Sequence, residues 1–132
     1  MKADTHWFSL RYSMECNIDV CLTGHDHTYS RSYQVQDGNV IDYDLSKGSV
    51  NNPEGTLYIT TGSGSGSKYY NLLNYTPYYI AERTNACLPS FSTIDFSSGT
   101  MTIKTHINIK LVHKRCKDNS VCCSIRICMR LS

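Results

Sequence analysis

The sequence predicts a single β-rich domain of the α+β class, and three observations support this prediction. At 132 residues the chain has about the length of one domain. Short runs of alternating apolar and polar residues recur along it, separated by turn-forming residues. Ten tyrosines, eight glycines and only three prolines also favour strands joined by loops.

Composition and charge exclude several classes of protein. The formal net charge of +2 is too small to indicate a nucleic-acid partner. No apolar run approaches the ~20 residues that a membrane-spanning helix needs. The segment from Met1 to His6 lacks the apolar stretch of a secretory signal. We therefore expect neither a nucleic-acid partner nor a membrane partner.

The first part of the chain is expected to contain one helix and one strand that leads into a turn. Residues 8–16 fit a short helix, because their apolar side chains are spaced four positions apart. Residues 18–22 are apolar and rich in β-branched side chains, which is typical of a short strand. The polar segment 23–27 follows directly, and functional side chains are commonly placed in such loops.

Two hairpins and a central strand are predicted further along. Asp37 and Gly38 form a two-residue turn signal within a hairpin over residues 33–43. Residues 56–61 form the clearest strand in the sequence, because they combine β-branched and aromatic residues. A second hairpin is predicted from residues 90–96 and 100–106.

A glycine–serine run, residues 62–67, directly follows the central strand. Its composition is typical of a flexible linker, whereas its position after a buried strand favours a close-packed loop near a site. Both interpretations remain open at this point. The run is not a phosphate-binding loop, because no Lys-Ser/Thr pair or helix-opening sequence follows it. Residues 44–55 and 68–88 are expected to be irregular.

The end of the chain differs in composition from the rest. Residues 1–109 carry seven Lys/Arg and ten Asp/Glu, whereas residues 110–132 carry six Lys/Arg, one Asp and four of the seven cysteines. We therefore expect a domain over residues 1–109 and an irregular, basic, cysteine-rich tail over residues 110–132, with a composition that permits disorder. Seven cysteines is an odd number, so at least one is free or pairs between chains.

The most informative motif is Gly24-His25-Asp26-His27. Imidazole nitrogen is a good ligand for Zn, Fe and Mn. Histidines two positions apart on a regular strand do not converge on one compact metal site, but in a sharp turn each can reach a different metal. We expect Gly24 to adopt the backbone conformation that such a turn needs. Taken alone, the motif is weak evidence for metal binding, because pairs of surface histidines are common.

The surroundings of this motif resemble a known family. An apolar strand followed by Gly-His-x-His, with Tyr29 and Arg31 behind it, is similar to the last metal-binding motif of the calcineurin-like metallophosphoesterases. The likeness is to the purple acid phosphatase-like branch, and it continues through residues 52–64 and the hairpin at 89–105. It implies a partial αββα sandwich, of which this chain would form the C-terminal sheet half.

The resemblance also implies a chemistry. The family holds two metal ions (Fe, Zn or Mn) that activate water for attack on a phosphate ester. His25 would bind the second metal and His27 the first, while Tyr29 and Arg31 would support the site or face the phosphate. For Arg31 a surface ion pair is an equally good interpretation. Asp26 is expected to face outward, and no residue is assigned as catalytic.

Two other ligand motifs of the family, G-D-x-x-Y and G-N-H-[DE], do not occur in this sequence, and Asp4-Thr5-His6 matches its D-x-H motif only by chance, because no strand precedes it. A two-metal site needs roughly seven protein ligands, including a bridging carboxylate, so two imidazoles from one turn do not fill it. We therefore expect a phosphoester hydrolase by family that is inactive alone and depends on a missing N-terminal half. The alternatives are a non-catalytic fragment and a Cys/His-rich interaction module over residues 106–128.

Overall fold

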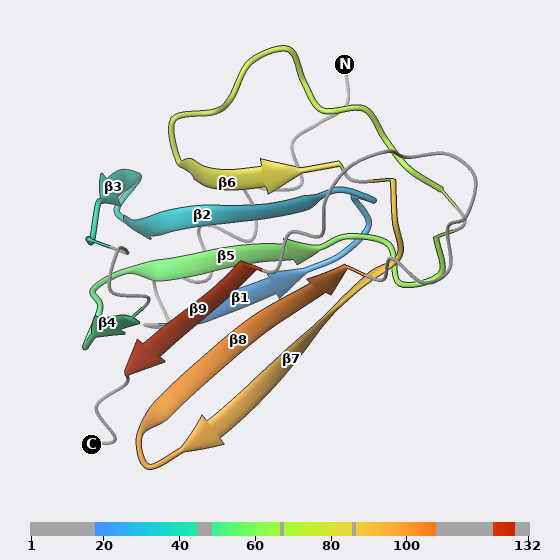
Figure 1. The fold of residues 1–132 in the computed structure, drawn as a ribbon. Helices are drawn as coiled ribbons and strands as arrows, with labels where there is room; N and C mark the ends of the chain where they lie inside the picture. The colour runs from blue at the N-terminus through green and yellow to red at the C-terminus, as the bar shows by residue number, and fades with distance from the viewer. Residues whose placement is uncertain (1–17, 45–48, 67, 86, 108–122, 129–132) are drawn as a thin grey trace.

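A computed structural model describes residues 18–44, 49–66, 68–85 and 87–107, together with the strand at residues 123–128. Within these ranges the chain forms nine β-strands and no helix, which confirms the predicted β-rich fold class. The helix expected at residues 8–16 lies outside the described part of the chain. The strands form two sheets, and those of the second sheet cross those of the first obliquely (Figure 1).

The first sheet contains five strands in the order β1-β5-β2-β3, and β6 also pairs with β2. Strands β1 and β5 are parallel, whereas β2 is antiparallel to each of its neighbours. The central strand occupies the residues predicted for it, and the first strand lies near its predicted position. Strand β6 falls in a segment expected to be irregular. The bounds are β1 (Val20–Thr23), β2 (Tyr29–Gln36), β3 (Asn39–Ile41), β5 (Thr56–Thr61) and β6 (Ile80–Thr84).

The second sheet contains four strands in the order β4-β9-β8-β7. The hairpin of β7 and β8 confirms the second predicted hairpin. The structure differs from the expected irregular tail at six residues, because β9 pairs antiparallel with β8 and parallel with β4. The other tail residues lie outside the described ranges. The bounds are β4 (Ser49–Asn51), β7 (Ser90–Ser97), β8 (Thr100–Ile107) and β9 (Cys123–Cys128).

The hydrophobic core joins the two sheets. It consists of three residues of the first sheet and two of β8, none more than 6% exposed: Tyr29, Leu57, Ile59, Met101 and Ile103. Burial of each such side chain contributes on the order of 1.5–3 kcal/mol relative to exposure, so this cluster is a main source of stability. It also fixes the start of β2, because Tyr29 is the first residue of that strand.

A β-bulge interrupts the pairing of β2 with β5. Arg31 pairs with Ile59 and Gln34 with Leu57, so two residues of β2 stand opposite Tyr58 alone. The backbone N–H of Tyr58 donates instead to the Ser32 hydroxyl at 2.9 Å. Ser32 is 1% exposed, so this side chain replaces a buried ladder hydrogen bond.

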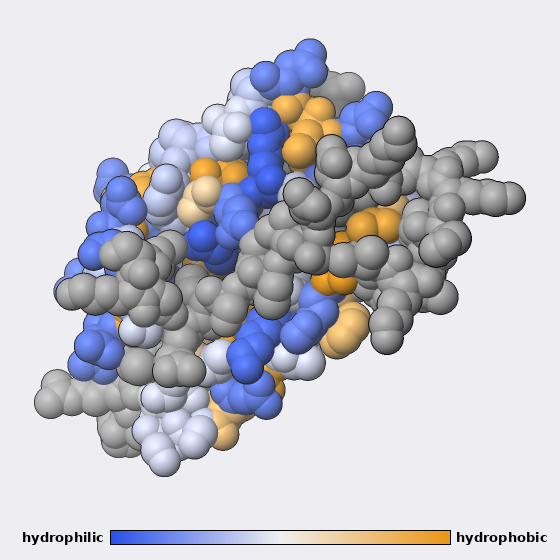
Figure 2. All heavy atoms as spheres, viewed as in Figure 1, coloured by the Kyte–Doolittle hydropathy of each residue, from blue (hydrophilic) through white to orange (hydrophobic). Residues whose placement is uncertain are grey.

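Apolar side chains are also present on the surface. Phe91 and Phe96 on β7, and Leu73, Tyr75 and Tyr78 in the loop before β6, are each more than half exposed. On the face drawn in Figure 2, apolar residues lie in separate small groups between polar ones. The described residues visible on this face therefore form no broad apolar patch of the kind that marks a binding surface. Among the described residues, no helix has the length and apolarity to cross a membrane.

Candidate metal-binding turn

The Gly24–His27 turn follows the carboxyl end of β1, as predicted from the sequence. Strand β1 pairs in parallel with the buried strand β5, and its last pair joins Thr23 to Thr60. The Thr23 hydroxyl lies 2.7 Å from the Thr60 hydroxyl and donates to the Ile59 carbonyl at 3.3 Å. The residue before the turn is therefore held by both backbone pairing and side-chain contacts.

The backbone of the turn corrects one expectation. The residue in the left-handed region is His25, with φ of 75°, and not Gly24. A Cβ at position 24 would meet nothing within 4 Å, so glycine is not needed there for space. A non-glycine residue in this region costs on the order of 1–3 kcal/mol and is enriched at functional sites. His25 and Asp26 are both exposed, as expected for Asp26.

His27 is held more firmly than His25. Its Nδ1 lies 2.7 Å from the backbone carbonyl oxygen of Lys68. A carbonyl oxygen only accepts hydrogen bonds, so Nδ1 carries the proton in this contact. In the neutral ring, the lone pair is then on Nε2, which becomes the nitrogen able to bind a metal. Histidine ligands of metals usually donate their other ring N–H in this way.

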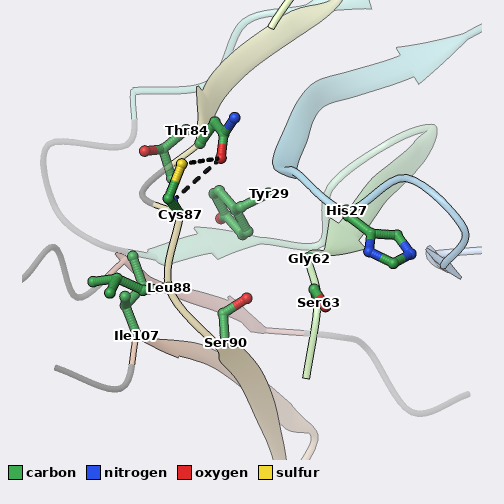
Figure 3. A pocket seen from close by; sticks show the side chains of 10 residues that line it. His27, Tyr29, Gly62, Ser63, Thr84, Cys87, Leu88, Ser90 and Ile107 are labelled. Atoms are coloured by element: carbon green, nitrogen blue, oxygen red, sulfur yellow. Dashed lines mark hydrogen bonds between the residues drawn. The ribbon is translucent and has the colours of Figure 1, made fainter. Parts of the chain in front are cut away.

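A small recess lies beside His27 (Figure 3). His27, Tyr29, Ser63, Cys87 and Ser90 contribute to its lining. Figure 3 shows His27 at the edge of the recess, with its ring directed away from Leu88 and Ile107. The recess has a volume of ≈ 10 Å³, on the order of what a single water molecule needs. It is therefore too small to be a substrate pocket.

Arg31 lies apart from this recess. Its guanidinium Nη2 is 3.3 Å from Glu82 Oε2, and the two residues stand opposite each other on β2 and β6. Arg31 lines a second recess, with Gln34 and Tyr43 among its neighbours. The structure therefore shows the ion pair, and a role of Arg31 at the site stays a prediction. Tyr29 lines the same recess as His27, but as a member of the core.

The described residues do not complete a two-metal site. Among them, no group of three or more His, Cys, Asp and Glu side chains is placed to hold a metal ion. The exposed His25 and the partly buried His27 come from one turn, and no bridging carboxylate accompanies them within the described ranges. The described residues alone therefore do not form a complete hydrolytic metal centre.

Two residues that contact His27 were not predicted from the sequence. The Tyr70 ring packs edge-on against the His27 ring, with centroids 5.2 Å apart and planes at 60°. The Lys68 Nζ lies 5.1 Å from the Tyr70 ring centroid, a cation–π contact. Lys68 is 41 positions from His27 in the chain, and no local pattern links residues so far apart.

The described strands are arranged like part of a solved protein structure, consistent with the partial metallophosphoesterase-like fold expected from the sequence. One such structure is that of a purple acid phosphatase, PPD1, isolated from yellow lupin (Lupinus luteus) seeds. It superposes with a TM-score of 0.67 at 13% sequence identity, over 89% of this chain and 19% of the phosphatase chain. At this identity the likeness establishes the fold alone. Comparison with models of protein families and with curated proteins gives no match.

Proposed function

We propose that this chain contributes part of a metal site for phosphoester hydrolysis, with His25 and His27 as its ligands. The observation that carries the proposal is the hydrogen bond from His27 Nδ1 to the Lys68 carbonyl, in a turn at the end of β1, which pairs in parallel with the buried strand β5. That bond leaves Nε2 as the ligating atom and fixes the ring. The fold shared with a purple acid phosphatase supports a binuclear centre of Fe, Zn or Mn and a phosphate ester as substrate.

The remaining ligands would come from residues outside the described ranges or from another chain. The chain spans 19% of the length of the phosphatase that it resembles, so most of that protein has no counterpart here. Two imidazoles leave most of the coordination positions of two metal ions unfilled. We therefore propose that the isolated chain binds a metal weakly and does not turn over phosphate esters.

Calorimetric titration with Zn²⁺ tests the ligand role. We expect weak binding that is lost when His25 and His27 are both replaced by alanine. His106→Ala is the matched control, because His106 stacks on Phe91 on the hairpin of β7 and β8 and is not a residue of the turn. Equal loss of binding in the control and in the double variant would show that the turn is not the metal site.

Hydrolysis of p-nitrophenyl phosphate and of bis-p-nitrophenyl phosphate, with added Mn²⁺, Zn²⁺ or Fe²⁺, tests the second part of the proposal. We expect the wild-type chain to give no metal-dependent turnover above buffer. Turnover that His27→Ala abolishes and His106→Ala retains would contradict the proposed inactivity, while supporting His27 as part of the site.

A further inference from the structure

The glycine–serine segment after β5, here residues 62–66, is a close-packed loop and not a linker. Gly66 has φ of +66°, and a Cβ there would lie 2.7 Å from both Pro89 Cγ and the Tyr69 hydroxyl. Gly62 has φ of +83°, and its Cβ would lie 2.5 Å from Ser90 Oγ. Residues other than glycine are therefore disfavoured at both positions, because a Cβ would lie too close to its neighbours and the backbone has a positive φ.

This loop is tied to the second sheet at the start of β7. The Ser90 N–H donates to the Ser63 carbonyl at 3.0 Å. The Ser90 hydroxyl donates to the Thr61 carbonyl at 2.8 Å, and Ser90 is 8% exposed. One buried serine thus fixes the path of the chain on leaving β5, which limits the positions that the following residues can reach.

The residues that follow the loop close around His27. The Asn85 side chain donates to the Tyr70 carbonyl and so ties Tyr70 to the end of β6. The Tyr70 ring restricts rotation of the imidazole by its edge-on contact. The Lys68 carbonyl accepts the Nδ1 proton, and a main-chain carbonyl keeps this acceptor role at every pH.

From these contacts we infer that Lys68, through its carbonyl, and Tyr70, through its ring, are positioning residues that hold His27 in the Nδ1–H tautomer. The loop at residues 62–66 brings them into place. The consequence for metal binding, that Nε2 is the ligating nitrogen, rests on the proposed function. The effect on the imidazole itself is a property of this chain without any metal.

Long-range ¹H–¹⁵N NMR of the imidazole rings in the full chain tests the inference directly, because it distinguishes Nδ1–H from Nε2–H tautomers. His27→Asn identifies the His27 signals. For wild type and Tyr70→Phe, which keeps the ring, we expect His27 in the Nδ1–H form at a pH where the ring is neutral. For Tyr70→Ala and Gly66→Ala we expect a mixture of the two tautomers.

Gly64→Ala is the matched control for the loop. A Cβ at Gly64 meets only the Ser90 carbonyl oxygen, at 3.8 Å, and this glycine does not have a positive φ. We expect it to leave the His27 tautomer unchanged. Thermal unfolding followed by circular dichroism establishes that each variant is folded, and Tyr70→Ala retains the test if Gly66→Ala does not fold, because Tyr70 is 39% exposed.

Zn²⁺ titration of the same variants separates the two proposals. Loss of a residue that orients a metal ligand typically weakens metal binding about 10- to 100-fold, which we expect for Tyr70→Ala and not for Tyr70→Phe. A fixed Nδ1–H tautomer in wild type without zinc binding at the turn would overturn the proposed function and leave the positioning role supported. An unchanged Nδ1–H tautomer in both folded Tyr70→Ala and folded Gly66→Ala would overturn the positioning role, whatever the metal affinity.

Discussion

Ser32→Ala probes how β2 and β5 remain joined across their bulge. The Ser32 hydroxyl is the acceptor for the Tyr58 N–H at 2.9 Å, and both residues are buried, at 1% and 8% exposure. Alanine removes that acceptor. The space left by the lost hydroxyl oxygen is too small for a well-coordinated water without rearrangement. A buried donor left unsatisfied costs roughly 1–3 kcal/mol, so we expect the free energy of unfolding to fall by about that amount.

Urea unfolding followed by circular dichroism measures this change, and hydrogen exchange at the Tyr58 amide localises it. Ser30→Ala is the matched control, because Ser30 lies on the same strand but is only partly buried. We expect the control to change stability by less than about 0.5 kcal/mol. If Ser32→Ala had an equally small effect and the Tyr58 amide stayed protected, the N–H would have another partner and the reasoning about the bulge would fail.

Three further predictions concern the core, the ion pair and one thiol. Ile103 is 1% exposed in the core between the sheets, so Ile103→Ala should lower the free energy of unfolding in urea by about 2–5 kcal/mol. Phe96 is 70% exposed, so Phe96→Ala should change it little, and similar values for the two variants would contradict a shared core. A double-mutant cycle of Arg31→Met and Glu82→Gln should give a coupling free energy of about 0.2–1 kcal/mol that shrinks with salt. We expect zinc binding to be unchanged in these variants, and altered zinc binding in Arg31→Met alone would support a site role for Arg31. Burial raises the pKa of the Cys21 thiol above its ordinary value of 9.0. The pH midpoint of Cys21 labelling by iodoacetamide, read by peptide mass spectrometry, should therefore be higher in the folded chain than in the urea-unfolded chain. Equal midpoints would refute this. Because the folded-state pKa is the higher one, the stability that Cys21 contributes is present below pH 9.0 and is lost as the pH rises through the folded-state pKa.

The strands that could be predicted from the sequence are those specified by local patterns. Strand β5 combines β-branched and aromatic residues, and the hairpins are marked by turn residues at Asp37-Gly38 and Ser98-Gly99. Strands β4, β6 and β9 lack such local marks and form by pairing with strands that are distant in the sequence. Strand β6, for example, is defined by its contact with β2, where Arg31 meets Glu82 some fifty residues further along. Tertiary pairing, and not intrinsic preference, decides such segments.

The candidate site divides in the same way. The turn at the end of β1 could be predicted, because an apolar strand followed by Gly-His-Asp-His is a local pattern. The conformation of that turn could not, since the positive φ falls on His25 and the sequence pointed to Gly24. Nor could the contacts of His27 with Lys68 and Tyr70, which depend on how the loop after β5 returns to the turn.

The most direct test of the central claim, that the turn at residues 24–27 binds a metal, is to map a bound ion on the backbone. Co²⁺ is paramagnetic and broadens the amide signals of nearby residues in ¹H–¹⁵N spectra. We expect broadening centred on His25 and His27, extending to Lys68 and Tyr70, and absent when both histidines are alanine. Broadening centred elsewhere, or unchanged by that double replacement, would contradict the claim.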